Sequence, residues 1–142
     1  MTFSTVPLNS APGLDRPAAD VMHAGHVTVP GRLPLTEAAR TLAARHVHAV
    51  LVCDDHGAPL GWVTTRGMLH NLPRDWEGAT AREAISEQLA TVAPTATVRD
   101  VLQAFLASGA SHVLVRADDD PMVLGVIAES DLLVLLAGDR PG

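Results

Sequence analysis

The histidines and the single cysteine are the side chains of this sequence that are best suited to metal binding or catalysis. Two histidine pairs, His23 with His26 and His46 with His48, have spacings that superficially resemble those of metal ligands. In a strand His46 and His48 would share one face, but no cysteine or carboxylate in the local sequence completes a set of four ligands. The pattern therefore argues against a metal site at these histidines.

Cys53 is the only cysteine, so the chain can form no intrachain disulfide. It ends an apolar run, which predicts a buried thiol, whereas a catalytic thiol needs an exposed, electropositive setting. No glycine-rich phosphate loop and no nucleophile elbow occurs. We therefore expect that the protein is not an enzyme. A small enzyme that acts at a cleft is the least favoured of the three function hypotheses, and the other two are given below.

Three consecutive carboxylates, Asp118, Asp119 and Asp120, form the densest charge cluster. Clustered carboxylates could attract a cation. They are followed by Pro121 and lie between two apolar runs, which is typical of a hairpin tip in water. We favour the hairpin tip.

The elements that must position these residues occur twice in the sequence. Thr28 recurs as Thr91 and Leu51 as Leu114 at one constant offset, and Gly61 then matches Gly125 one position later than that offset requires. A single insertion in a turn explains the change while the strand pairing is kept. Two copies of one unit predict a pseudo-symmetric body with a cleft at the seam, where small ligands commonly bind.

Composition excludes several classes of protein. The 142 residues are 47% hydrophobic with a formal net charge of -6, which gives no basic face for nucleic acid or anionic lipid. No apolar run approaches the ~18 residues that span a bilayer. The segment 1–17 lacks the features of a signal peptide, so we expect a cytoplasmic protein without membrane or nucleic-acid partners.

Apolar periodicity predicts the same order of elements in both copies. Thr97 with Asp100 should cap the second long helix, while the first has Pro34 at the corresponding place and lacks that cap. A half of roughly 60 residues would be marginal alone, so the halves should need each other. The predicted elements are a turn of helix at 20–22, strands at 26–29, 49–53, 60–64, 112–116 and 123–128, and helices at 35–45, 65–71, 98–106 and 129–136.

Proline and glycine positions predict the segment boundaries. The expected segments are a flexible N-terminal tail or strap (1–17), a first β-α-β-β-α repeat (18–72), a connector (73–80), a second such repeat (81–138) and a C-terminal tail (139–142).

With this order of elements, the chain resembles a tandem pair of CBS (cystathionine-β-synthase) domains over most of its length. The resemblance rests on the repeated motifs above and on the segments that begin at Asp20, Leu35, Val47, Val98 and Gly125. It implies an α/β (α+β) fold of two repeats packed about a pseudo-two-fold axis. It also implies a homodimer and two inter-repeat clefts, which in many members bind adenine nucleotides or S-adenosylmethionine.

In competent family members the last strand and helix read Gly-x-x-Ser/Thr-x-x-Asp, and the carboxylate accepts hydrogen bonds from the ribose hydroxyls. This chain divides that motif between its copies. The first keeps Thr64 but has Gly67 in place of the acid, and the second keeps Asp131 but has Ala128 in place of the hydroxyl. Family members also often have a proline where Leu51 and Leu114 stand, so adenine contacts do not carry over.

The resemblance makes the cleft containing Asp131 the better candidate. The residues that match lining positions there are Thr91, Ala93, His112, Ala128 and Glu129, together with Asp131. The corresponding residues of the other cleft are Thr28, Val29, His48, Thr64 and Arg66.

Each polar candidate also has a structural interpretation. Asp131 could simply cap its helix, and both interpretations stay open. Thr64 and Thr65 are more typical of helix caps than of phosphate ligands, and Arg66 is more typical of a solvated surface. Trp62 fits core or dimer packing better than stacking on adenine.

Two function hypotheses remain ahead of the enzyme. The first is a regulatory sensor that binds AMP, ADP, ATP or S-adenosylmethionine, requires no cofactor, and acts through its dimer surface or on an unidentified protein target. The second is a ligand-free dimerisation or interaction scaffold with degenerate clefts, which the divided motif favours.

Overall fold

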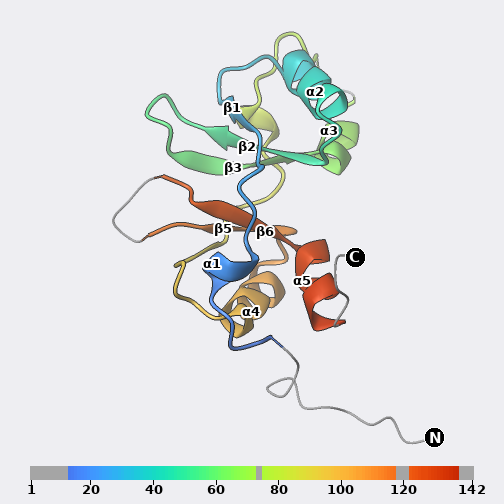
Figure 1. Ribbon diagram of the computed structural model, residues 1–142. Helices are drawn as coiled ribbons and strands as arrows, with labels where there is room; N and C mark the ends of the chain where they lie inside the picture. Colours follow the sequence, from blue (N-terminus) through green and yellow to red (C-terminus); the bar gives the residue numbers. More distant parts are fainter. Residues whose placement is uncertain (1–12, 73–74, 118–121, 138–142) are drawn as a thin grey trace, which may run out of the picture. The chain divides into compact units, whose positions relative to one another are not determined.

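The computed structural model describes residues 13–72, 75–117 and 122–137 (Figure 1). The predicted tip at Asp118 to Asp120, most of the predicted N-terminal tail and the C-terminal tail lie outside these residues.

The described chain is a mixed α/β fold with two three-stranded sheets, which confirms the predicted fold class. In each sheet the first strand pairs parallel to the second, and the second antiparallel to the third. The strands are β1 (Thr28–Pro30), β2 (Ala49–Cys53), β3 (Pro59–Thr64), β4 (Thr91–Val92), β5 (His112–Val115) and β6 (Gly125–Ala128). The helices are α1 (Ala18–Val21), α2 (Leu35–Ala44), α3 (Thr65–His70), α4 (Val98–Ser108), α5 (Glu129–Leu136) and a 3₁₀ helix (Arg82–Ala84).

The predicted helix α4 shows its predicted N-cap. The Thr97 hydroxyl accepts the Asp100 N–H, and the Asp100 carboxylate accepts the Thr97 N–H, so both halves of a capping box are present. Helix α2 begins after Pro34 without a side-chain cap, also as predicted. The sequence did not predict the 3₁₀ helix, because so short an element carries too little periodicity to be recognised.

The chain forms two compact units, and each unit includes a segment from the start of the other repeat. Among the described residues, the β4–β6 unit contains 13–24 and most of those from Ala90 onward, whereas the β1–β3 unit contains those between 25 and 89. The first repeat begins near residue 18 and the second near residue 81. The first residues of each repeat pack against the sheet of the other repeat. We call these first residues, 18–24 and 81–89, the exchanged segments.

Backbone hydrogen bonds hold each exchanged segment. In the β4–β6 unit, His23 and Val126 each donate an N–H to the other's carbonyl, at 3.0 and 2.9 Å. In the β1–β3 unit, the Trp62 N–H donates to the Glu87 carbonyl at 3.0 Å and the Ser86 N–H to the Trp62 carbonyl at 2.9 Å. At each edge the exchanged segment thus forms backbone hydrogen bonds with one residue of the last strand, Val126 in β6 and Trp62 in β3.

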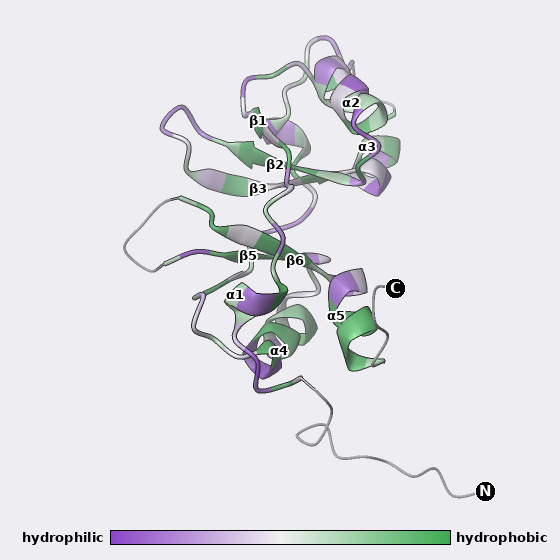
Figure 2. Cartoon of the chain, in the orientation of Figure 1, coloured by the Kyte–Doolittle hydropathy of each residue, from purple (hydrophilic) through white to green (hydrophobic). Residues whose placement is uncertain are grey.

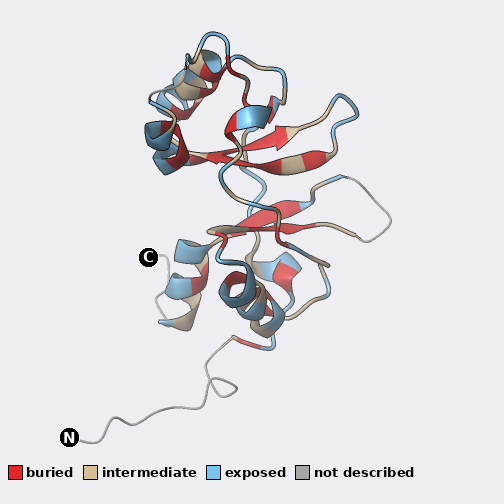
Figure 3. Ribbon diagram, turned by 180° about the vertical axis from the view of Figure 1, so that it is seen from behind, coloured by how far each residue is buried: buried red, intermediate tan, exposed pale blue. Residues whose placement is uncertain are grey.

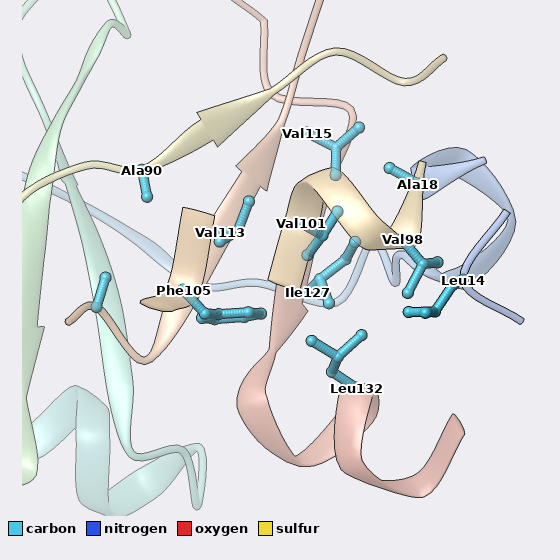
Figure 4. Close-up of a cluster of buried hydrophobic side chains, with 11 residues drawn as sticks. Leu14, Ala18, Ala90, Val98, Val101, Phe105, Val113, Val115, Ile127 and Leu132 are labelled. Carbon is cyan, nitrogen blue, oxygen red and sulfur yellow. The ribbon is translucent and has the colours of Figure 1, made fainter. Parts of the chain in front are cut away.

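Each unit has its own apolar core. In the β4–β6 unit, helix α4 places Val98, Val101 and Phe105 against Val113 and Ile127 of the sheet (Figure 4). Leu14 joins this core and is 2% exposed. Because the Val98 and Arg99 N–H groups also donate to the carbonyls of Arg16 and Leu14, the stretch just before α1 is fixed to the start of α4.

The core of the β1–β3 unit is built from the equivalent positions and from its exchanged segment. Helix α2 contributes Leu35, Ala38 and Leu42, and the exchanged segment contributes Ala81 and Ala84. Strands β2, β3, β5 and β6 are the most continuously buried parts of the two units, as Figure 3 shows. Periodic apolar residues thus form the helices, and small alanines let the exchanged segment approach closely.

Gly61 provides a test of this packing. A Cβ at Gly61 would lie 2.5 Å from Ile85 Cγ2 and 3.0 Å from the Glu87 carbonyl oxygen, so Gly61→Ala must displace the Ile85 side chain or the exchanged segment. We expect a loss of about 1–3 kcal/mol in the free energy of unfolding, measured by urea titration.

Gly25→Ala is the matched control, because nothing lies within 4 Å of a Cβ at Gly25. Equal stability changes in the two variants would show that the exchanged segment does not pack against Gly61.

Candidate functional site

The junction between β6 and α5 positions Asp131, the leading candidate. Asp131 stands in the first turn of α5, and its Oδ2 accepts the Ala128 N–H at 2.9 Å. The same oxygen lies 3.2 Å from Nε2 of His23 on the exchanged segment. The Asp131 side chain is 38% exposed, so it is accessible to a ligand while held by two partners.

Strand register places several predicted residues on one face of the β4–β6 sheet. Paired residues in neighbouring strands present their side chains on the same face. Thr91 pairs with Leu114, Leu114 with Val126, and Val126 with His23, which forms one row across the sheet.

A second row on the same face contains His112, which pairs with Ala128. The alternate residues Val113, Val115 and Ile127 belong to the core on the other face. We call the face that carries Thr91, His112, Ala128 and His23 the Asp131 face.

Ala93 and Glu129 lie at the ends of these elements. Ala93 follows β4 and is partly buried, and Glu129 is exposed at the start of α5, where its N–H donates to the Ser111 carbonyl at 3.1 Å. The Ser111 hydroxyl lies 2.9 Å from Nδ1 of His112 and thereby orients that ring. The structure thus brings the predicted residues of the second repeat to one sheet face and its adjoining helix end.

The corresponding junction of the β1–β3 unit, between β3 and α3, has different contacts. The Thr64 hydroxyl accepts the Gly67 N–H at 3.0 Å and lies 3.0 Å from the Ser86 hydroxyl of the exchanged segment. The predicted cap role of Thr64 is confirmed. That of Thr65 is wrong, because Thr65 is already inside α3 and its hydroxyl donates to the His48 carbonyl at 3.3 Å.

Gly67 cannot be replaced by a larger residue in this arrangement. A Cβ there would lie 2.5 Å from Ser86 Oγ and 2.7 Å from its Cβ. The acid that the motif lacks at this position would therefore collide with Ser86 of the exchanged segment. Packing of that segment explains why the first repeat has no counterpart of Asp131.

The other first-repeat candidates are not gathered in the same way. Thr28 is exposed and shares a face with Leu51 and Trp62, since these residues pair across the sheet. Val29 lies in the core, so only its backbone could meet a ligand. His48 and Arg66 are both exposed.

The divided motif has a physical interpretation at these two junctions. In α4 a single capping box uses a hydroxyl at the N-cap and a carboxylate on the third residue of the helix. At the start of α3 only the hydroxyl half is present, from Thr64, and at the start of α5 only the carboxylate half, from Asp131. Each repeat thus keeps one half of a capping box, and each half satisfies one backbone N–H.

Sequence reasoning did not identify His23 and Ser86 as partners of these two residues. Both belong to the exchanged segments, and the exchange has no signature in local periodicity. The only signal was the repeat itself, which aligns Met22 with Ile85 and so places the two segments at equivalent positions.

The histidine pair near α2 does not lie in a strand, so the two side chains share no strand face. His46 lies in a turn with a φ of 52°, and His48 precedes β2. Both line a largely apolar cavity of about 520 Å³ between α2 and α3. Within the described residues, no group of three or more His, Cys, Asp or Glu side chains could hold a metal ion.

Cys53 does not have the surroundings of an activated nucleophile. Its side chain is partly exposed rather than buried as predicted. Desolvation raises the pKa of the Cys53 thiol, and the nearby Asp54 carboxylate raises it further. Hydrogen bonds from the Ala58 and His56 N–H groups hold the pKa of Asp54 below its usual range, which keeps that negative charge beside the thiol.

The sequence matches the CBS domain family over residues 18–74 and 81–138, which is most of the chain. The chain belongs to the CBS-domain family. The predicted recognition is therefore confirmed, and the pair of CBS domains indicates a regulatory rather than a catalytic module. No curated protein matches the chain by sequence.

Solved structures show the same fold at low sequence identity. Hypoxic Response Protein I with two coordinated zinc ions has 23% identity and a TM-score of 0.69, over 82% of this chain and 96% of that one. An uncharacterized conserved protein from Pyrococcus horikoshii has 20% identity and a TM-score of 0.75, over 91% and 96%. A CBS domain protein from Pyrobaculum aerophilum complexed with AMP has 20% identity and a TM-score of 0.72, over 86% and 98%.

The elevated thiol pKa predicts slow alkylation of Cys53. Because the thiolate is the reactive form, iodoacetamide should label Cys53 more slowly than free cysteine at pH 8, and the midpoint of the rate–pH profile should lie above that of free cysteine. Asp54→Asn should lower that midpoint, since it removes a negative charge beside the thiol.

Asp55→Asn serves as the control, because the neighbouring Asp55 carboxylate is paired with Arg32 at 2.8 Å. Mass spectrometry of the labelled chain is unambiguous with one cysteine. A wild-type midpoint at or below that of free cysteine would contradict this account of the thiol.

Proposed function

We propose that this chain is a regulatory sensor that binds an adenosine-containing ligand at the Asp131 face of its β4–β6 unit. The observation that carries the proposal is the position of Asp131, a partly exposed carboxylate at the β6–α5 junction beside the sheet face that carries Thr91 and His112. A carboxylate accepts only, and the two hydroxyls of a ribose offer it two donors.

The relative complexed with AMP supports this ligand class. AMP, ADP, ATP and S-adenosylmethionine share the adenosine that Asp131 would recognise, and no separate cofactor is required. The proposed site also includes Ala93, Ala128 and Glu129, whose side chains are small or polar.

The β1–β3 unit is the weaker candidate site. Its predicted contacts are Thr28, Val29, His48, Thr64 and Arg66, but Thr64 is engaged by Gly67 and Ser86, and no acid stands at Gly67. An anion could still meet Arg66, which is exposed in the first turn of α3.

Ligand binding would regulate by favouring one arrangement of the protein over another. A ligand can shift such an equilibrium only by its difference in affinity for the two arrangements. Asp131 is a suitable point of control, because it contacts both the end of β6, through the Ala128 N–H, and the exchanged segment, through His23.

A ligand-free scaffold is the second candidate function. It is favoured by the engagement of both motif residues, since Asp131 and Thr64 already satisfy backbone N–H groups without any ligand. In that case the occupied junctions are purely structural, and the chain acts through its surfaces on another protein.

We further propose that the chain is a cytoplasmic homodimer. Large apolar side chains lie exposed on the helices. Figure 2 shows that α5 is hydrophobic over much of its length. Leu106 on α4 is 73% exposed and Leu133 on α5 is 69% exposed. A second copy that buries them removes apolar surface from water.

No helix among the described residues has the length and apolar character to cross a bilayer. The acidic charge also disfavours nucleic acid as a partner.

The ligand proposal predicts stabilisation of the folded chain. AMP, ATP or S-adenosylmethionine at about 100 times its Kd should add about 2.7 kcal/mol to the stability, seen as a rise in Tm by thermal shift. Asp131→Ala should abolish that rise, because it removes the acceptor for the ribose hydroxyls.

Asp100→Ala is a closely matched control. Asp100 is also the third residue of a helix in the same unit, and it also accepts the N–H of its N-cap residue, at 3.0 Å. Both variants should therefore lose about 1 kcal/mol of stability as cap variants. Only Asp131→Ala should lose the ligand response, and no response of the wild type to any adenosyl compound would favour the scaffold.

The dimer proposal predicts that charge on the helix face separates the copies. Leu106→Glu and Leu133→Glu should each convert a dimer to a monomer, because a carboxylate buried in an apolar contact is strongly unfavourable. Light scattering after size exclusion measures the mass.

Gln103→Glu adds the same charge to an exposed position of α4 and should leave the dimer intact. A monomeric wild type, or dimeric Leu106→Glu and Leu133→Glu variants, would overturn the proposed interface.

A further inference from the structure

The exchanged segment of the β4–β6 unit brings a histidine to the proposed ligand site. His23 pairs with Val126 at the edge of β6, and its backbone is held by two hydrogen bonds to that residue. Its side chain therefore lies on the Asp131 face, while the preceding Met22 packs against the core on the other face. The register of this short pairing determines which side the imidazole occupies.

The contact between His23 and Asp131 is specific in its atoms. Nε2 of His23 lies 3.2 Å from Oδ2, the same oxygen that accepts the Ala128 N–H at 2.9 Å. One hydrogen bond from the Ala128 N–H and one ion-pair contact from His23, on two different elements, meet at this oxygen and restrain the rotation of the carboxylate group. The other oxygen, Oδ1, is thereby oriented in a fixed direction relative to the sheet.

The other unit shows that this arrangement belongs to the fold. There the exchanged segment places the Ser86 hydroxyl 3.0 Å from the Thr64 hydroxyl, again at the junction between the last strand and its helix. In both units the exchanged segment thus delivers a polar side chain to the motif residue of the host sheet. A histidine at this place is the particular feature of the β4–β6 unit.

We propose that His23 is a positioning residue that holds the Asp131 carboxylate in the orientation that binds the ribose hydroxyls. This inference rests on the proposed function, since it concerns how the same site recognises its ligand. Nε2 carries a hydrogen in one neutral tautomer and in the imidazolium, so a favourable contact with the carboxylate does not require a charged ring. Restraining the acceptor before binding lowers the cost of ordering it when the ligand arrives.

A purely structural ion pair would behave differently. Side chains that are 49% and 38% exposed form a pair that contributes little to stability. Loss of such a pair would change the affinity for every ligand equally or not at all. Loss of a positioning contact should act on the ribose hydroxyls in particular.

The test is isothermal titration of the full chain with AMP, 2′-deoxy-AMP and 3′-deoxy-AMP. Wild type should bind AMP about tenfold or more tightly than either deoxy analogue, as expected when a hydrogen bond to a charged acceptor is lost. His23→Ala should weaken AMP binding about tenfold and leave the deoxy analogues nearly unchanged, so that the preference for the intact ribose falls toward one.

His23→Gln tests the mechanism, because its amide can donate to Oδ2 and should restore part of the preference. His56→Ala is the control, since it removes an exposed histidine from the β2–β3 hairpin of the other unit and should change nothing. In an Asp131→Ala background, His23→Ala should have no further effect, because the residue it positions is gone. A thermal melt of each variant confirms that it is folded.

The outcomes separate the two proposals. Wild type that binds none of the three nucleotides overturns the proposed function, and the role of His23 falls with it. Wild type that binds AMP, with the same ribose preference in His23→Ala, overturns only the role of His23. A uniform loss across AMP and both analogues also overturns it, and assigns His23 a general structural role.

Discussion

The pairing of two short exchanged segments with the outer edges of β3 and β6 is the constraint on which the other features of this chain depend. A three-stranded sheet with an open edge presents unpaired N–H and carbonyl groups. Here the segment around His23 pairs with Val126, and the segment around Glu87 pairs with Trp62. Each unit is therefore completed by the start of the opposite repeat, so a repeat on its own would leave that edge of its sheet unpaired. At Gly125, a Cβ would lie 2.6 Å from the Met22 sulfur of the exchanged segment.

The strand-to-helix junctions connect this constraint to function. Each junction must satisfy backbone N–H groups that the helix leaves unpaired. One unit does so with the Thr64 hydroxyl and the other with the Asp131 carboxylate, and each of these groups meets a polar side chain from the exchanged segment. The residues through which the CBS family is expected to recognise a nucleoside are thus also the residues that contact the exchanged segments. A ligand at Asp131 would act directly on a contact that ties the segment to its sheet.

Much of this molecule could be predicted from the residues alone. Apolar residues at helical spacing predicted α2 and α4, strand β2 was predicted at its observed bounds, and Thr97 with Asp100 predicted a capping box that is present. The internal repeat also predicted the family, since an ordered set of motifs occurring twice is a global pattern that survives local ambiguity. The missing acid at Gly67 and the missing hydroxyl at Ala128 were likewise visible in the sequence, although their meaning was not.

Only the tertiary structure decided which partner each of these residues meets. Local periodicity determines which side of a strand or helix is apolar, because that information lies within a few neighbouring residues. It cannot determine that His23 crosses to the sheet of the second repeat or that Ser86 fills the space beside Gly67, because these contacts join residues far apart in the chain. The sequence by itself determined the elements, the duplication and the candidate carboxylate. The fold determined that Asp131 is held by His23, since only the pairing of distant backbone segments places those two side chains on one face.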